Sequence, residues 1–201
     1  MAHHFLVKNM HLSVADIIRA QEFAHAGHDL IRQVRKYTGG HYWVHTDAVA
    51  NAWHDFPSSY SYIPIGILGE IVCHLHDLDE DVNIYPYNLQ GIRERFGPDV
   101  AYCVEELTHK YTPQKYPSLN RAERKVLEAW RLGNALGITQ DVKIFDLMDN
   151  TPSIIKYDPG FAKIYLKEKE FILSLLTRAT PELLAKAKRQ LTKEKKKLSM
   201  K

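Results

Sequence analysis

The sequence predicts an all-α protein of about eight helices with no significant sheet. Apolar residues recur at helical spacing along most of the 201 residues, and no stretch alternates polar and apolar side chains long enough to predict a strand. Proline, glycine and asparagine punctuate the helical stretches. The chain is 45% hydrophobic and 25% charged, which is ordinary for a globular protein with a real core.

Each helix can be justified in order from its boundary residues. Ser13 followed by Asp16 resembles a capping box, and the helix it opens runs to the Gly-Gly pair at 39–40. Asn88 can cap a later helix, and Pro98 suits a first helical turn. The stretch 139–150 continues the helix before it and should stop ahead of a proline at 152. The expected helices cover residues 14–37, 48–56, 64–76, 89–96, 98–111, 119–136, 139–150, 161–176 and 181–197.

The C-terminal segment differs in charge from the rest. The stretch "AKAKRQLTKEKKKLSMK" holds eight Lys or Arg and one Glu, whereas the whole chain has a net charge of only +3. We therefore expect one domain over residues 1–180 and a basic C-terminal helix or tail over 181–201. A solvated helix end is favoured over a nucleic-acid patch, because the tail has no interleaved aromatic residue. A nucleic-acid partner is not expected.

The cysteine spacing and the hydropathy of the sequence favour a cytoplasmic location. Cys73 and Cys103 lie thirty residues apart without a CxxC pattern, as expected for buried thiols in a reducing environment. The start "MAHHFLVKNMHLS" lacks the apolar core of a signal peptide. No apolar run approaches the roughly 18 residues of a membrane span. We expect a cytoplasmic protein without a membrane partner.

The stretch "CHLHDLDED" gathers metal-ligand side chains at the end of an apolar helix. Adjacent residues diverge by about 100° along a helix, but at its end His76 and Asp77 can reach one point beyond the axis. Imidazole nitrogen and carboxylate oxygen suit Mn, Fe, Zn or Mg. Glu80 and Asp81 lie about one turn further on and can approach the same point. A cation would relieve the repulsion among these carboxylates; a solvated acidic helix end is the alternative.

Further ligands must come from elsewhere in the fold. His45 stands at the start of the second helix, in "GGHYWVH". Asp146 lies on what should be the inner face of an apolar helix, with Asn150 one turn later on the same face. A second His-Asp pair, at His54, directly precedes a Pro-Ser turn and lacks following acids. We interpret that pair as surface residues or as a support of the site.

Four motifs in order carry a family resemblance. They are "RKYTGGHYWVH", "HDLDED", "FGPDVA" leading to "THK", and "KIFDLMDN", within a stretch from about Phe23 to Ser153. This series resembles the HD-domain phosphohydrolases, and more narrowly the hydrolase domain of the RelA/SpoT alarmone enzymes and their small single-domain relatives. The His-Asp dipeptide alone is a weak signal, whereas four motifs at suitable spacings are a strong one.

The resemblance implies a ligand set and residue roles. One divalent metal ion, commonly Mn²⁺, is bound by four side chains. Glu80 and Asp81 position or activate the attacking water. Arg35 and Lys36 face phosphate or the nucleotide, while Asn150 and Ser153 hold the ribose or phosphate end. The implied metal ligands are His45, His76, Asp77 and Asp146.

The implied activity is metal-dependent hydrolysis of a small phosphorylated nucleotide. The best interpretation is removal of the 3′-pyrophosphate from (p)ppGpp, giving GDP or GTP. The family usually reads "QxRKSGxPY", but here Tyr37 and Thr38 follow the Lys, and Leu147 follows Asp146 where the family has Arg. Two alternatives stay open. One is the same chemistry on a dNMP, a dNTP or NADPH; the other is a non-catalytic protein that binds a nucleotide or, through its tail, a nucleic acid.

Overall fold

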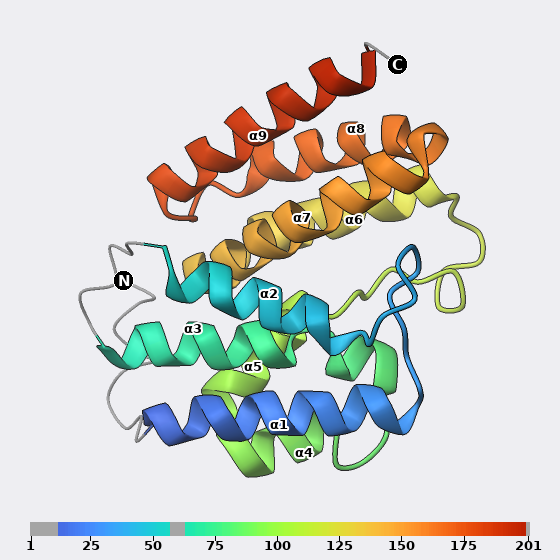
Figure 1. Ribbon diagram of the computed structural model, residues 1–201. Helices are drawn as coiled ribbons and strands as arrows, with labels where there is room; N and C mark the ends of the chain where they lie inside the picture. The colour runs from blue at the N-terminus through green and yellow to red at the C-terminus, as the bar shows by residue number, and fades with distance from the viewer. Residues whose placement is uncertain (1–11, 57–62, 200–201) are drawn as a thin grey trace. The chain divides into compact units, whose positions relative to one another are not determined.

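The computed structural model describes residues 12–56 and 63–199, and within these ranges it is all-α, as the sequence predicts. The chain divides between Thr108 and His109 into two compact units, which are described separately below. Unit 1 contains α1 (Val14–Leu30), α2 (Trp43–His54), α3 (Ile63–Leu75), the π-helical turn η2 (Leu78–Val82), α4 (Leu89–Phe96) and α5 (Pro98–Leu107). Unit 2 contains α6 (Arg121–Gly133), α7 (Gly137–Tyr157), α8 (Pro159–Leu175) and α9 (Pro181–Ser199) (Figure 1).

The first helix is shorter than the sequence predicts. α1 ends at Leu30, and the expectation of a helix to residue 37 is wrong. Arg32 takes a left-handed φ of 52°, its N–H bonds to Asp29 O, and the N–H of Gln33 bonds to His28 O at 3.0 Å. These two bonds form a Schellman ending, which apolar periodicity alone does not reveal. A tight loop follows instead, closed by an isolated bridge between residues 34 and 41.

Close packing of α2 on α3 fixes the centre of unit 1. A Cβ at Gly69 would lie 1.9 Å from a ring carbon of Trp53, so only glycine permits this approach. Asp47 of α2 lies 3.0 Å from His25 of α1 and 3.2 Å from His74 of α3. Burial raises the pKa of Asp47, but its contacts with His74 and His25 outweigh that effect and hold the pKa below its usual range. The three helices are thereby joined around one carboxylate.

The acidic cluster lies on the turn after α3. Residues Leu78–Val82 form the π-helical turn η2, which Asn83 closes with a left-handed φ of 46°. Leu78 and Val82 are buried and anchor the turn. π-Helical turns are rare in proteins overall, but those that occur often lie at functional sites. The turn thus presents the acids between two buried apolar residues. The predicted Pro-Ser turn after the second helix lies in residues 57–62, outside the described ranges.

In unit 2, α7 continues through a proline. The expectation that this helix stops before Pro152 is wrong, because it runs on to Tyr157. A proline in a helix leaves the carbonyl four residues earlier without its usual donor. That carbonyl belongs to Met148, and Gln190 of α9 donates to it from its side-chain amide at 3.3 Å. A residue from another helix thus accommodates the proline.

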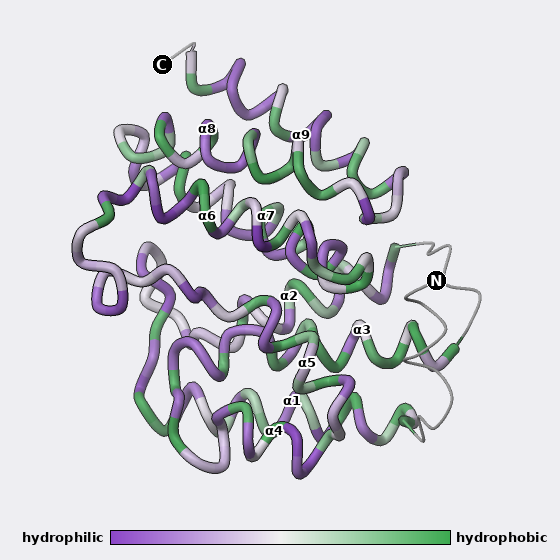
Figure 2. Tube along the Cα trace, turned by 180° about the vertical axis from the view of Figure 1, so that it is seen from behind, coloured by the Kyte–Doolittle hydropathy of each residue, from purple (hydrophilic) through white to green (hydrophobic). Residues whose placement is uncertain are grey.

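The C-terminal helix packs into unit 2 through a buried ion pair. Lys169 of α8 is 1% exposed; its Nζ donates to Thr151 Oγ1 at 2.7 Å and lies 3.3 Å from Glu194 of α9. Gln190 donates to the same carboxylate at 2.6 Å. Along the chain, α3 is mostly hydrophobic and α9 mostly hydrophilic (Figure 2). The domain boundary expected at residue 180 stays a prediction.

Candidate metal centre

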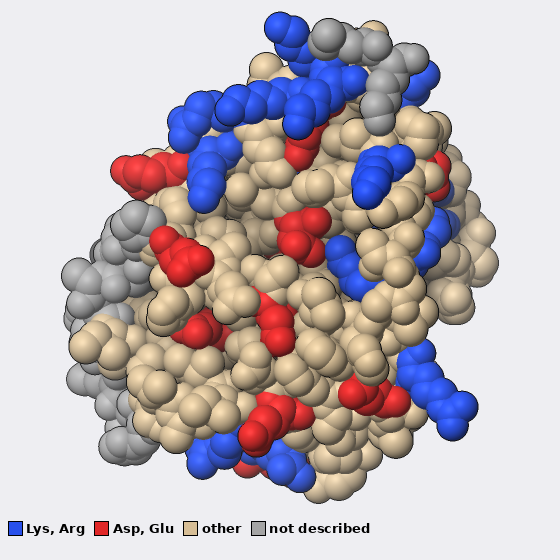
Figure 3. Space-filling view, in the orientation of Figure 1, with Lys and Arg blue, Asp and Glu red and all other residues tan. Residues whose placement is uncertain are grey.

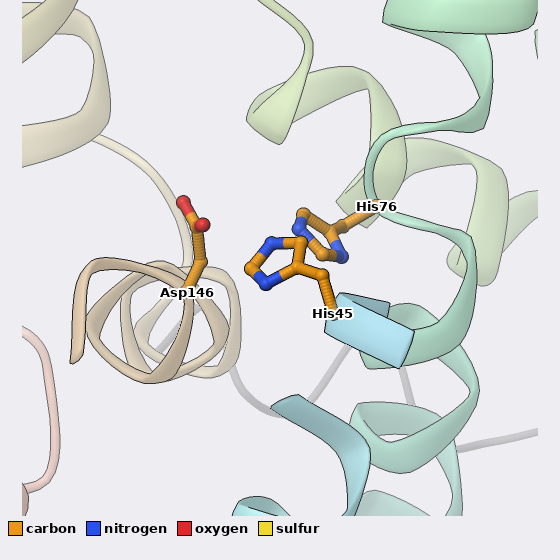
Figure 4. A group of neighbouring side chains, drawn as sticks. All are labelled: His45, His76 and Asp146. Atoms are coloured by element: carbon orange, nitrogen blue, oxygen red, sulfur yellow. The ribbon is translucent and has the colours of Figure 1, made fainter. Parts of the chain in front are cut away.

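Two histidines and an aspartate of unit 1 meet where α2 begins and α3 ends. His45 lies in the first turn of α2, and His76 directly follows α3. Their rings are 5.2 Å apart, and one nitrogen of each lies within 4.8 Å of the other (Figure 4). The Nε2 atoms of His45 and His76 lie 3.7 and 3.1 Å from Asp77 Oδ2. Both imidazoles are buried, so three donor groups converge in a space shielded from solvent.

A hydrogen bond fixes the state of His76. Its Nδ1 lies 2.8 Å from the carbonyl oxygen of Cys73, which can only accept. Nδ1 therefore carries a proton, and Nε2 is the ring nitrogen that faces Asp77. A metal-binding histidine characteristically donates its second ring N–H to a carbonyl in this way. The hydroxyl of Tyr42 donates to Asp77 Oδ2 at 2.6 Å and orients that carboxylate.

A further histidine, which sequence reasoning missed, borders this cluster. His28 of α1 is fully buried, and its Nδ1 bonds to the side-chain oxygen of Gln33 at 2.7 Å. Burial lowers the pKa of His28, while the Gln33 bond and the nearby Asp77 charge oppose that shift. A sequence signal existed, since His28 continues the helical stripe of Ala20 and Ala24. A histidine on such an apolar stripe is a candidate for a buried polar cluster.

Gln33 joins this histidine to the acidic turn. Its amide nitrogen donates to Asp81 Oδ2 at 2.8 Å, while its side-chain oxygen is hydrogen-bonded to His28 Nδ1. Asp81 is solvent-exposed on one side. Desolvation by surrounding protein atoms, followed by the neighbouring Asp77 and Glu80 carboxylates, nevertheless raises the pKa of Asp81 to about 7, against the hydrogen bond from Gln33.

The predicted phosphate-binding residues lie in the loop after α1. Arg35 N–H donates to Gly40 O at 2.8 Å, and Gly39 N–H donates back to Arg35 O at 2.9 Å. Gly39 has a φ of 70°, a conformation that favours glycine. The Lys36 ammonium lies 4.9 Å from the centre of the Tyr37 ring. The loop is thus a compact turn that presents both cations, and their contact with a substrate stays a prediction.

The remaining predicted site residues belong to α7 of unit 2. Asp146 is buried, its Oδ2 lies 2.6 Å from Lys143 Nζ, and its Oδ1 accepts from Asn150 at 2.5 Å. Ser153 Oγ donates to the backbone oxygen of Asn150 at 2.9 Å. The i, i+4 spacing noted in the sequence therefore produces a real contact between Asp146 and Asn150. Figure 4 includes the Asp146 side chain, which projects from α7.

The second His-Asp pair is a surface feature. The His54 side chain is 71% exposed, and its Nδ1 lies 3.3 Å from Glu70 Oε2. It takes no part in the cluster of His45, His76 and Asp77. His54 therefore serves as a matched control for substitutions at the buried histidines.

A solved structure decides the fold. The chain is similar to a metazoan ortholog of SpoT that hydrolyses ppGpp, with a TM-score of 0.67 and 20% sequence identity. The similarity covers 90% of this chain and 98% of that one. This chain has an HD-domain fold of the RelA/SpoT type. The predicted fold is thus confirmed, while at this level of identity the activity must be argued from the site. No protein-family model and no curated protein matches the chain.

Proposed function

We propose that this protein is a metal-dependent phosphohydrolase of a small nucleotide, and that it removes the 3′-pyrophosphate of (p)ppGpp. One observation carries the proposal: buried His45 and His76 and the carboxylate of Asp77 converge beside a turn rich in further carboxylates. In support, the fold is that of a ppGpp hydrolase. The buried thiols of Cys73 and Cys103, which form no disulfide, suit the reducing cytoplasm.

The donor set fits a divalent cation. Two neutral imidazoles and a carboxylate are suitable ligands for Mn²⁺, and the Cys73 carbonyl holds His76 in the ligating tautomer. The Asp77 and Glu80 carboxylates add to the desolvation that raises the pKa of Asp81, and a bound cation would offset their charge. We assign Asp146 of α7 as the fourth ligand, on the basis of its motif and its buried carboxylate. When bound, the ion would polarise a phosphoryl oxygen and make water more acidic.

Side chains around the cluster would activate the attacking water. Glu80 and Asp81 would together position the attacking water and accept a proton from it. The water oxygen then bonds to phosphorus, and the bond from that phosphorus to the ribose 3′ oxygen breaks. The 3′ oxygen takes up a proton, and the products are pyrophosphate and GDP or GTP.

Cations and polar groups would hold the substrate. The Arg35 guanidinium can make two parallel hydrogen bonds to a phosphate, and Lys36 adds a second positive charge. Asn150 and Ser153 would bind the ribose or phosphate end. Lys143 lies 2.6 Å from Asp146 and would keep that carboxylate ionised.

A second candidate substrate has its own support. The turn that carries Arg35 and Lys36 is longer than the family motif and contains Tyr37 and Thr38, where the family has a small serine. A bulky turn at the base-contacting segment could favour another nucleotide, such as a dNMP, a dNTP or NADPH. The metal chemistry would be unchanged.

A nucleotide panel separates these possibilities. The Mn²⁺-loaded protein is incubated with ppGpp, GDP, dGTP and NADPH, and products are identified by mass. We expect pyrophosphate release from ppGpp at the highest kcat/KM. Cleavage of another nucleotide with ppGpp inert would establish the second candidate, and no turnover of any nucleotide would favour a non-catalytic binding protein. Asp146→Ala should abolish turnover with helicity retained, whereas His54→Ala should stay near wild type.

A further inference from the structure

The solvent side of α8 and α9 carries a concentration of positive charge that the proposed hydrolase does not use. Along α9, Arg189, Lys193 and Lys196 follow one another at helical spacing on the face away from the core. Figure 3 shows Lys and Arg side chains gathered along this helix. We call the following residues the basic face: Lys163, Lys167, Lys188, Arg189, Lys193, Lys195 and Lys196.

The acids of these helices do little to neutralise the basic face. Glu194 is buried and pairs with Lys169, so its charge is balanced inside the protein and does not offset the basic face. Glu170 lies 2.6 Å from Lys195 and offsets one cation of the face. The basic face keeps a clear excess of positive charge after that pair is counted. An anionic partner is the chemical complement of such a surface.

A pocket of about 330 Å³ opens at this face between α8 and α9. Three lysines line it, Lys163 and Lys167 of α8 and Lys195 of α9. Leu166 and Leu198 supply apolar walls. This combination fits a ligand that joins an anionic group to a hydrocarbon body, because the cations bind the first and the leucines the second.

Exposed apolar side chains also lie on α8, the helix that supplies two lysines of the pocket. Ile164 and Phe171 of α8 are 52% and 37% exposed, and Lys167 lies between them in sequence. Side chains of this kind can enter the boundary between headgroups and acyl chains while neighbouring lysines contact the headgroups. By contrast, α9, which carries five of the seven cations of the basic face, contains no aromatic residue on which a nucleic-acid base could stack, and α8 adds only Phe171 among its large exposed aromatic residues. The surface therefore favours lipid over nucleic acid.

We propose that the basic face binds the surface of an anionic lipid bilayer, with one lipid phosphate held by Lys163, Lys167 and Lys195. The first methylenes of that lipid then contact Leu166 and Leu198. Clusters of four to eight Lys or Arg on one helix are typical of binding to anionic lipids. The attachment is peripheral, in keeping with the finding that no helix within 12–56 and 63–199 is long and apolar enough to cross a membrane.

Vesicle sedimentation of the full chain tests this inference. The protein is mixed with phosphatidylcholine vesicles that contain or lack phosphatidylglycerol, at low and at high salt. We expect binding only to the anionic vesicles, weakened by salt because exposed charges are screened. Equal binding to neutral vesicles, or none to anionic ones, would overturn the inference. Tighter binding to a single-stranded oligonucleotide than to anionic vesicles would do the same.

Matched variants separate the pocket from general charge. Lys163→Gln/Lys167→Gln/Lys195→Gln should weaken vesicle binding at least about tenfold, given roughly 1 kcal/mol for each cation near an anionic surface. The control Arg93→Gln/Lys115→Gln/Lys156→Gln removes the same charge elsewhere and should bind like wild type. Equal loss in both triple variants would show only diffuse attraction and contradict the assigned pocket. Ile164→Ser/Phe171→Ser should weaken binding at high salt, where the apolar contribution dominates.

Discussion

Two buried polar clusters, one around His45 and His76 in unit 1 and one around Lys169 in unit 2, differ in how their charges are balanced. In unit 2, the ammonium of Lys169 meets the carboxylate of Glu194, and Thr151 and Gln190 complete the hydrogen bonds. In unit 1, the imidazoles of His45 and His76 stand beside Asp77, and desolvation, followed by the neighbouring Asp77 and Glu80 carboxylates, raises the pKa of Asp81 to about 7. The cluster of unit 2 contains its own cation, whereas for the cluster of unit 1 we propose a metal ion.

This difference indicates a structural role for the cluster of unit 2 and a ligand-binding role for the cluster of unit 1. A buried pair that carries both charges holds helices together and offers no place for a ligand. A buried set of lone-pair donors next to surplus negative charge is electrostatically incomplete, as a metal site is before its ion is counted. The two clusters should therefore respond oppositely to removal of a carboxylate.

The largest expected effect is on the rate of hydrolysis. Glu80→Gln removes a charge from the acidic turn without removing an assigned ligand. We expect kcat to fall by about 10²–10⁴-fold, the usual contribution of a general acid–base group, while metal content and folding stability are kept. Steady-state kinetics with metal analysis measure this effect. Loss of bound metal in the variant would instead make Glu80 a ligand.

The next effect is on the stability of unit 2. Glu194→Ala leaves the Lys169 ammonium buried without its carboxylate, which should lower the free energy of unfolding by about 3–5 kcal/mol. Chemical denaturation followed by circular dichroism measures the loss. The double variant Lys169→Met/Glu194→Leu removes both charges and should recover most of it. A cost below about 1 kcal/mol for Glu194→Ala would mean that the pair is not structurally important.

A smaller effect of opposite sign is expected in unit 1. The pKa of Asp81 is raised on folding, so its ionisation costs stability increasingly as pH rises from its ordinary value near 3.8 through about 7. Asp81→Asn should therefore stabilise the metal-free protein at pH 8, by about 1 kcal/mol once screening of this exposed carboxylate is allowed for. The gain should disappear near pH 4. Thermal melts at both pH values, with chelator present, measure it. Destabilisation at pH 8 would contradict the account.

The sequence predicted the parts of the molecule that local chemistry determines. Helical periodicity predicted the all-α fold, and the motif order predicted the HD-domain type. The dense run from His76 to Asp81 predicted a polar cluster at a helix end, and the structure brings His45 to the same place. The fold predictions are confirmed, since helical periodicity and motif order depend on residue type and spacing, while the roles of the site residues stay predictions.

The features that were missed depend on contacts between distant segments. The left-handed Arg32 ends α1 early and turns Gln33 back onto His28, and no composition rule marks an arginine for that role. Pro152 was expected to end a helix, but Gln190, thirty-eight residues later, supplies the lost donor. Tertiary contacts of this kind can override local propensity, and a single sequence does not reveal them.

Metal-dependent stabilisation tests the central claim most directly. The chelator-treated protein is titrated with Mn²⁺, and its melting temperature is followed for wild type, Asp77→Ala and His54→Ala. At a metal concentration of about 100 times Kd, wild type and His54→Ala should gain about 2.7 kcal/mol of stability, because the ion binds only the folded chain. Asp77→Ala should gain almost nothing. Equal stabilisation of all three proteins, or of none, would contradict a metal centre at His45, His76 and Asp77.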